Sequence, residues 1–66
     1  MSNRKIELEG EMVKCGVTRE DLCQLLHLSY PALQSKIVGK TEFKCDEMFA
    51  IQKRLGTDMT LDKLFA

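Results

Sequence analysis

The stretch LLHLSYPALQSKI, residues 25–37, decides the fold because helical spacing runs into it, breaks in its middle and starts again at once. His27 ends the first helical pattern, and Ser29 is of a residue type that caps helix N-termini. Pro31 falls in the first turn of the next helix, where its missing N–H breaks no intrahelical bond. The stretch therefore predicts two helices joined by a turn of about three or four residues.

Both helices have clear outer limits. The first begins after Thr18, because Thr18-Arg-Glu-Asp21 resembles a capping box with aspartate in place of the usual glutamate. The second ends at Gly39, a typical C-terminal stop. The first helix has apolar residues at Leu22, Cys23, Leu25 and Leu26. In the second helix, Leu33 and Ile37 form the inward stripe, with Tyr30 at its edge.

Three further helices are expected around this pair. One covers about residues 4–15, with Ser2 or Asn3 as its cap and Gly16 at its end. Its apolar residues form two faces: Leu8, Met12 and Cys15 on one, Ile6 and Val13 on the other.

The second of these helices covers about residues 45–55 and ends at Gly56, and a short one follows Thr60. Their residues at helical spacing are Cys45, Met48, Ile51, Gln52 and Leu55, bordered by Phe49, and then Leu61, Leu64 and Phe65. Nothing alternates with period two for long enough to predict a strand. We therefore predict a single compact all-α domain of five helices over residues 1–66.

Composition narrows the class of protein. The 66 residues carry a formal net charge of zero, whereas nucleic-acid binders usually have a basic face, so the distribution of charge matters more than its sum. The three cysteines are odd in number and the N-terminal MSNRKIELEGEM has no apolar signal core, which predicts a cytoplasmic protein with reduced thiols. No apolar run approaches the roughly 20 residues that span a bilayer, so no membrane partner is expected.

The helix pair meets the packing needs of a helix-turn-helix. Cys23 is a small residue where the second helix packs closely, while Leu28 and Leu33 are apolar where the turn and the second helix face inward. From Thr18 to Phe65 the chain resembles the lambda-repressor-like, Cro/repressor (XRE-type) helix-turn-helix family, and most of all small phage-borne regulators of Gram-positive hosts. The resemblance lies in TREDLCQLLHLS, ALQSKIVGKTEF and the closing IQKRLG and LDKLF.

The chain departs from the family pattern in two places. His27 stands where the family usually has a left-handed glycine, a conformation that histidine adopts at some cost. Lys36 and Ile37 stand where the wider family often has an aromatic–glutamate pair, and Met12 replaces the basic partner of that glutamate. A buried ion pair replaced in this way by apolar residues can be neutral or stabilising.

The resemblance implies a set of DNA contacts. The implied base-reading residues are Tyr30, Pro31, Gln34 and Ser35. Gln34 is the best candidate for a specific contact because an amide can bond adenine N6 and N7 together. The implied phosphate contacts are Arg19, Lys36, Lys40, Thr41 and Lys44. Lys36, Lys40 and Lys44 would gather on the DNA side, away from acidic residues on the first helix and near the C-terminus: Glu7, Glu9, Glu11, Asp58 and Asp62.

A dimer is expected, because the family binds two half-sites about 34 Å apart on double-stranded DNA. The first candidates for the dimer contact are the apolar residues of the C-terminal end: Met59, Leu61, Leu64 and Phe65. Ile6 and Val13 are a second candidate.

The expected function is that of a sequence-specific transcriptional regulator, a phage or prophage repressor or Cro-like protein that binds an operator. The alternative is a helix-turn-helix fold used as a protein-interaction module, such as an anti-repressor or an antitoxin-like partner binder. Neutral charge and the Tyr-Pro-Ala start of the second helix favour this alternative, and the lysines favour DNA. No enzyme, small-molecule substrate or cofactor is expected, because no nucleophile–base pair or phosphate loop is present. A zinc site from Cys15, Cys23, Cys45 and His27 would match no Cys-x-x-Cys spacing.

Overall fold

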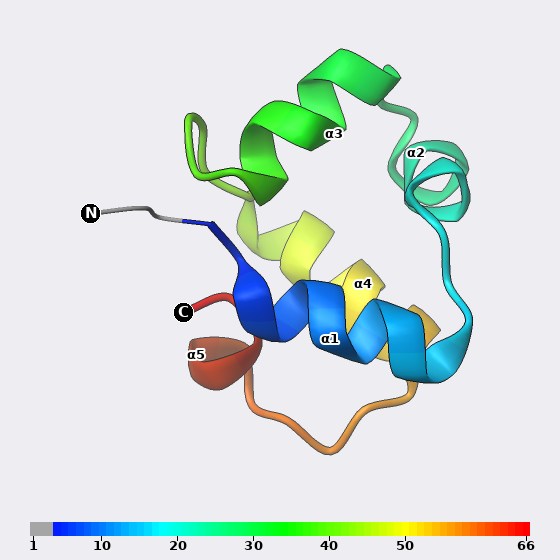
Figure 1. The fold of residues 1–66 in the computed structure, drawn as a ribbon, viewed down its shortest axis with the longest axis vertical. Coiled ribbons are helices and arrows are strands. Elements are labelled where there is room, and N and C mark those ends of the chain that lie inside the picture. The colour runs from blue at the N-terminus through cyan, green and yellow to red at the C-terminus, as the bar shows by residue number, and fades with distance from the viewer. Residues whose placement is uncertain (1–3) are drawn as a thin grey trace.

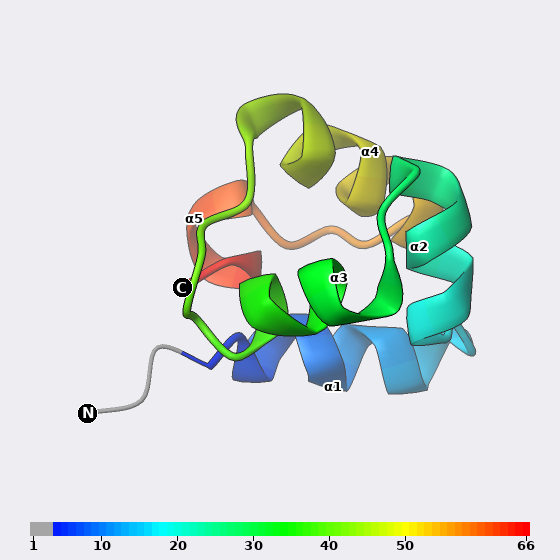
Figure 2. The same ribbon diagram turned by 90° about the horizontal axis from the view of Figure 1, so that it is seen from above.

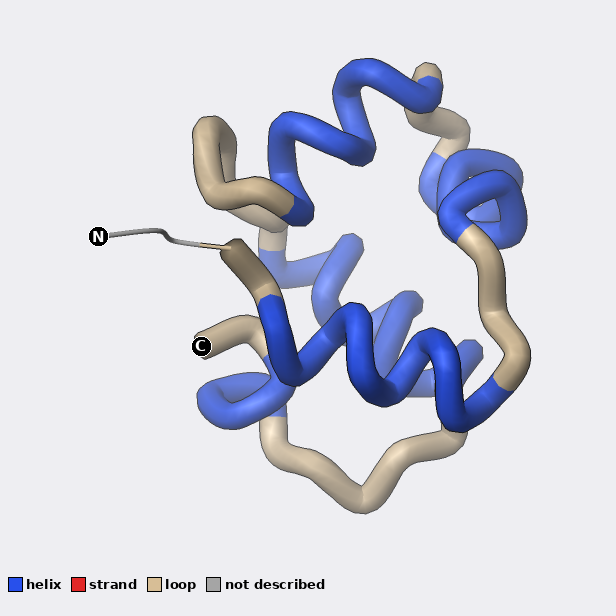
Figure 3. The backbone as a smooth tube through the Cα atoms, in the orientation of Figure 1, coloured by secondary structure: helices blue, strands red, loops and turns tan. Residues whose placement is uncertain are grey.

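The computed structural model describes residues 4–66, which form five α-helices and no strand (Figure 3). Both the all-α class and the number of helices are therefore confirmed for this part of the chain. The helices are α1 (Ile6–Cys15), α2 (Arg19–Leu26), α3 (Tyr30–Ile37), α4 (Cys45–Leu55) and α5 (Leu61–Leu64).

The helices surround one core. α4 lies behind α1 in Figure 1 and also contacts α2 and α5. α3 lies above α1 and α4 in Figure 1, and Figure 2, seen from above, shows α2 at the right of the view and α5 at the left. The backbone N–H of Lys5 donates to the carbonyl oxygen of Ile37 at 2.8 Å, which joins the start of α1 to the end of α3.

Apolar residues from all five helices form the core, as the helical spacing predicts. Six side chains are fully buried: Leu8, Leu22, Leu33, Ile37, Ile51 and Leu64. Two connections add Val17 and Phe43, and the Phe43 and Phe65 rings meet edge to face with centroids 5.1 Å apart. Burial on this scale is the main stabilising term for so short a chain.

The predicted helix ends are confirmed for the central pair. The Thr18 hydroxyl accepts from the Asp21 N–H at 3.2 Å, and the Asp21 carboxylate accepts from the Thr18 N–H at 2.9 Å, which makes the capping box. The Ser29 hydroxyl accepts from the Ala32 N–H at 3.4 Å, and Pro31 lies in the first turn of α3. His27 has φ 57° and takes the left-handed conformation predicted for it.

Several expectations at the periphery were wrong. α1 begins at Ile6 rather than Arg4, and Lys5 stands at its cap position without a capping side-chain bond. The proposed caps Ser2 and Asn3 lie outside the described residues. Cys15, expected on the same face as Leu8 and Met12, is exposed, although its thiol donates to the Leu55 carbonyl oxygen at 3.2 Å. Phe49, expected at the border of the apolar face of α4, is 58% exposed.

Candidate functional site

The candidate site is built on the corner between α2 and α3, residues 19–37. The N–H groups of His27 and Leu28 both donate to the Cys23 carbonyl, so the chain turns sharply at the end of α2. Cys23 and Leu28 are half-buried and pack against the core, and Leu33 is fully buried beneath them. The three residues therefore occupy the inward places predicted for them, and this packing sets α3 against α2.

The exposed part of α3 is its first turn. Tyr30 is 53% exposed and Pro31 is also exposed, whereas Gln34 and Ser35 are half-buried further along the helix. All four predicted base-reading residues thus lie on one short helix. An approaching ligand would meet the aromatic ring and the proline before the polar side chains behind them.

Gln34 is held by a bond that links α3 to α2. The Arg19 Nε–H donates to Gln34 Oε1 at 2.9 Å, and Arg19 Nη2 lies 2.8 Å from Glu9 Oε2 on α1. Arg4 donates to both oxygens of the same carboxylate, from Nε to Oε1 at 2.6 Å and from Nη2 to Oε2 at 2.9 Å. The hydrogen bond from Arg4 is the largest cause of the lowered pKa of Glu9, and Arg19 adds to it while partial burial opposes it.

This arrangement corrects the sequence-based placement of Glu9. Glu9 was expected among the acidic residues away from the candidate site, yet its carboxylate touches Arg19, one of the predicted site residues. The structure thus brings Arg19 and Gln34 together and adds Glu9, which sequence reasoning missed. No spacing in the sequence signals this contact, because Glu9 and Arg19 lie on different helices, ten positions apart.

Lys36 lies on the other side of α3 in a nearly closed setting. Its ammonium is 3.1 Å from Glu47 Oε1 on α4, donates to the Glu42 carbonyl at 3.0 Å and lies 5.9 Å from the centre of the Phe43 ring. The two ionic side chains are only 12% and 11% exposed. A phosphate contact from Lys36, as predicted, would therefore require the loss of a formed ion pair.

Burial would by itself raise the pKa of the Glu47 carboxyl, but the hydrogen bond from the Lys44 N–H at 2.9 Å and the nearby Lys36 outweigh it. The pKa of Glu47 is consequently lower than its ordinary value. Glu47 stays ionised to a lower pH than an ordinary glutamate, so the ion pair with Lys36 persists as well.

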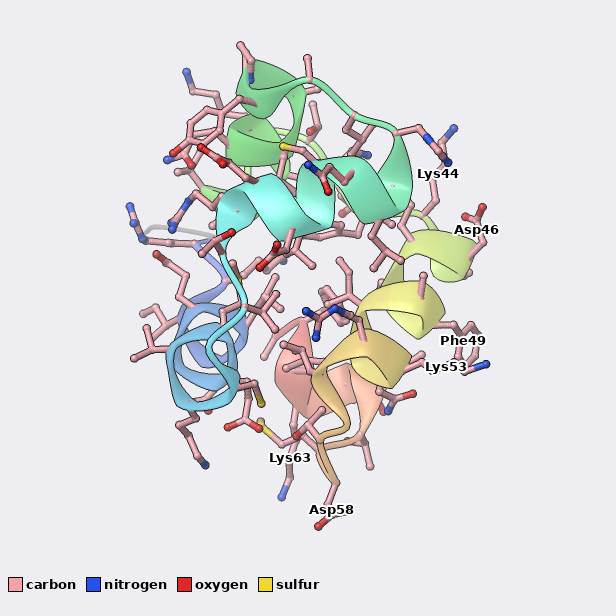
Figure 4. All side chains as sticks on the ribbon, turned by 90° about the vertical axis from the view of Figure 1, so that its right-hand side faces the viewer. Lys44, Asp46, Phe49, Lys53, Asp58 and Lys63 are labelled. Atoms are coloured by element: carbon pink, nitrogen blue, oxygen red, sulfur yellow. The ribbon has the colours of Figure 1, made fainter. Side chains whose placement is uncertain are left out.

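The remaining predicted phosphate contacts lie on the surface. The N–H groups of Lys40 and Thr41 donate to the Ser35 carbonyl at 2.9 and 3.3 Å, so the turn after α3 folds back on that helix. Gly39 takes φ 90° in this turn, which suits glycine. Lys40, Thr41 and Lys44 are exposed, and Figure 4 shows Lys44 pointing outward at the start of α4.

The residues predicted for the dimer contact at the C-terminal end are buried or half-buried within the folded monomer. Leu64 is fully buried and is therefore a core residue, and Phe65 packs on Phe43. Met59 and Leu61 are half-buried. The second candidate is open, since Ile6 and Val13 on α1 are 70% and 82% exposed.

Within residues 4–66, no group of three or more histidine, cysteine, aspartate or glutamate side chains is arranged to hold a metal ion. In the same range, every helix is too short or too polar to cross a membrane. No known protein family, curated protein or solved structure matches the chain. Any function must therefore be argued from the residues of the α2–α3 corner themselves.

Proposed function

We propose that this protein is a sequence-specific DNA-binding transcriptional regulator of the lambda-repressor-like helix-turn-helix type, a phage or prophage repressor or a Cro-like protein. The observation that carries the proposal is the α2–α3 corner. A left-handed residue at His27, an inward Leu28 and a Ser29 cap join two eight-residue helices there. In a helix-turn-helix of these proportions, the first helix crosses the DNA backbone and the second lies in the major groove.

Exposed and half-buried residues of α3, together with exposed residues of the turn that follows it, supply suitable contacts for this role. Tyr30 and Pro31 would offer apolar contact to a thymine methyl, and Gln34 and Ser35 would offer hydrogen bonds to base edges. Lys40, Thr41 and Lys44 would meet phosphates beside the groove. We place less weight on Lys36, because its charge is already paired with Glu47.

The neutral chain predicts modest affinity for each subunit, because phosphate neutralisation supplies much of the binding free energy of DNA-binding proteins. A dimer on two half-sites would add affinity and site length. With Leu64 in the core, we favour the exposed stripe of Ile6 and Val13 on α1 as the dimer contact.

A random-site selection on duplex DNA, followed by binding measurements at several salt concentrations, tests the proposal. We expect an enriched sequence whose affinity falls with salt, with a log–log slope of about −0.9 for each phosphate neutralised. Gln34→Ala should relax the preference at one base pair, whereas Lys40→Ala should weaken all sequences alike and reduce the slope by about 0.9. Absence of any enriched, salt-sensitive site would exclude the proposal.

A protein-interaction module is the second candidate, and one observation favours it. An open groove between α1 and the start of α3 is lined by Met12, Val13, Val17 and Tyr30, with Glu9, Thr18, Arg19 and Glu20 at its polar rim. Apolar surface with a polar border is typical of protein contacts. Under this alternative, Val13→Asp would abolish binding to a partner protein, and the DNA selection would enrich nothing.

A further inference from the structure

A chain of hydrogen bonds runs from α1 through the first residue of α2 to the middle of α3. Glu9 accepts from Arg19 at 2.8 Å, and Arg19 donates to Gln34 at 2.9 Å. Hydrogen bonds from a guanidinium are charge-assisted and stronger than those between neutral groups. Arg19 and Glu9 are 27% and 23% exposed, so solvent only partly weakens the pair.

This chain determines which way the Gln34 amide faces. A guanidinium has only donors, so the amide must turn its oxygen, and not its nitrogen, toward Arg19. The Gln34 nitrogen then faces away from Arg19, and no residue in the described range accepts a hydrogen bond from it. An amide free to rotate could exchange oxygen and nitrogen, but this one has a fixed donor and a fixed acceptor side.

The same series of hydrogen bonds engages both donor sites of Arg19 that are described above. Its Nη2 is held by Glu9 and its Nε by Gln34, so it cannot swing to a DNA phosphate without losing both partners. Arg19 is therefore placed as a positioning residue for Gln34, and Glu9 holds Arg19 in that position.

We propose that Glu9 sets the base preference of Gln34 by holding Arg19 against it, an inference that rests on the proposed DNA-binding function. Base edges in the major groove differ in their order of donors and acceptors, so an amide of fixed orientation discriminates between them better than one that can flip. Loss of Glu9 would release Arg19 toward phosphate and leave Gln34 free to turn.

The expected effects of Glu9→Gln on DNA binding have opposite signs. The variant removes a negative charge near the DNA and loosens the two guanidiniums that Glu9 holds, those of Arg4 and Arg19, so affinity for unrelated duplexes should rise about two- to fivefold. Preference at the base pair read by Gln34, identified as the pair where Gln34→Ala loses its preference, should fall about fivefold or more. A purely structural role of Glu9 would instead weaken all sequences together.

Glu7→Gln is the matched control. Glu7 is exposed on the same helix and the substitution changes the net charge by the same amount. Each variant is measured on the selected site, on sites altered at the Gln34 base pair, and on an unrelated duplex. We expect Glu7→Gln to keep the wild-type preference at that pair.

The outcomes separate the inference from the proposed function. Unchanged preference in Glu9→Gln overturns the role of Glu9 while DNA binding stands, and no salt-sensitive binding by the wild type overturns both. If Glu9→Gln does not fold, Arg19→Lys serves instead, because an ammonium lacks the fork that holds two partners at once. Arg19→Lys should lose the preference too, and retention of the preference would overturn the inference.

A measurement without DNA adds an independent check. In the free wild-type protein, the Arg19 Nε–H should exchange slowly with solvent in nuclear magnetic resonance spectra. Glu9→Gln should accelerate this exchange, and Glu7→Gln should not. Rapid exchange in the wild type would overturn the inference whatever the DNA experiments show.

Discussion

The two polar sides of α3 are built from similar parts but differ in what they can do. On one side Lys36 pairs with Glu47, with side chains 12% and 11% exposed. On the other side Arg19 pairs with Glu9 and holds Gln34, with the ionic side chains 27% and 23% exposed. The Lys36 side is closed by Phe43 and the Glu42 carbonyl, whereas the Gln34 side leaves an amide nitrogen facing away from Arg19.

This difference shows that the charge of a side chain on a helix does not by itself decide the role of that side chain. Lys36 would serve DNA binding well if it were exposed, but its position against α4 makes it a link between two helices. Gln34 is neutral, yet its position at the end of a charged chain makes it the better candidate for recognition. Burial and partners distinguish the two sides.

The largest expected effect comes from the core residue beneath both sides. Leu33 is fully buried, so Leu33→Ala should lower the free energy of unfolding by about 3 kcal/mol. Chemical denaturation measures this loss. Both the Lys36–Glu47 pair and the Arg19–Gln34 bond should weaken, because Leu33 packs α3 against the core. Leu25→Ala is the control, since Leu25 is 37% exposed on α2 and its loss should cost less than about 1 kcal/mol.

The next prediction compares the two carboxylates directly. Glu47→Ala leaves Lys36 largely buried without its partner and should cost about 2 kcal/mol of unfolding free energy. Glu9→Ala breaks a more exposed pair and should cost about 1 kcal/mol or less. If the two variants lost equal amounts of unfolding free energy in denaturation experiments, the two ion pairs would contribute equally to stability, and the contrast between the two sides of α3 would be wrong.

Acid should weaken the ion pairs of both Glu9 and Glu47. The pKa values of Glu9 and Glu47 are lower in the folded state than their ordinary value of about 4.3. The unfolded state therefore binds more protons between the folded and ordinary values, and stability rises with pH across that range. The stability that the two ionised carboxylates contribute is complete at pH values above their ordinary pKa. It is lost as the pH falls through their pKa in the folded state.

Thermal unfolding followed between pH 6 and pH 3 measures this loss. The double variant Glu9→Gln, Glu47→Gln should show a flatter dependence of unfolding temperature on pH than the wild type. If the unfolding temperature of the wild type did not change between pH 6 and pH 3, the stabilising roles of the Glu9 and Glu47 carboxylates would be contradicted.

The smallest expected effect concerns the turn that positions α3. His27 has φ 57°, so His27→Gly should relieve backbone strain and raise the free energy of unfolding by about 0.5–1 kcal/mol. Gly16→Ala, at φ 68°, should have the opposite sign and a similar size. Because His27→Gly leaves the turn geometry unchanged, the bond between Arg19 and Gln34 should persist, which the exchange rate of the Arg19 Nε–H checks.

The starts of α2 and α3 follow from neighbours in sequence, which is why they could be predicted, unlike the start of α1. The Thr18–Asp21 capping box and the Ser29 cap each involve residues three positions apart, whereas the left-handed conformation of His27 was expected from the resemblance to the helix-turn-helix family. The inward positions of Leu22, Leu33 and Ile37 follow from helical periodicity for the same reason. These local signals were sufficient to predict that five helices exist, but not where α1 begins.

Only the tertiary structure decided which polar residues face solvent. Lys36 meets Glu47, Glu9 meets Arg19, and Arg19 meets Gln34 across different helices. Leu64, expected at a dimer contact, is likewise a core residue because α5 folds back onto the rest of the domain. Such contacts depend on how whole helices pack, and helical periodicity places a side chain on a face without saying which neighbouring helix it meets.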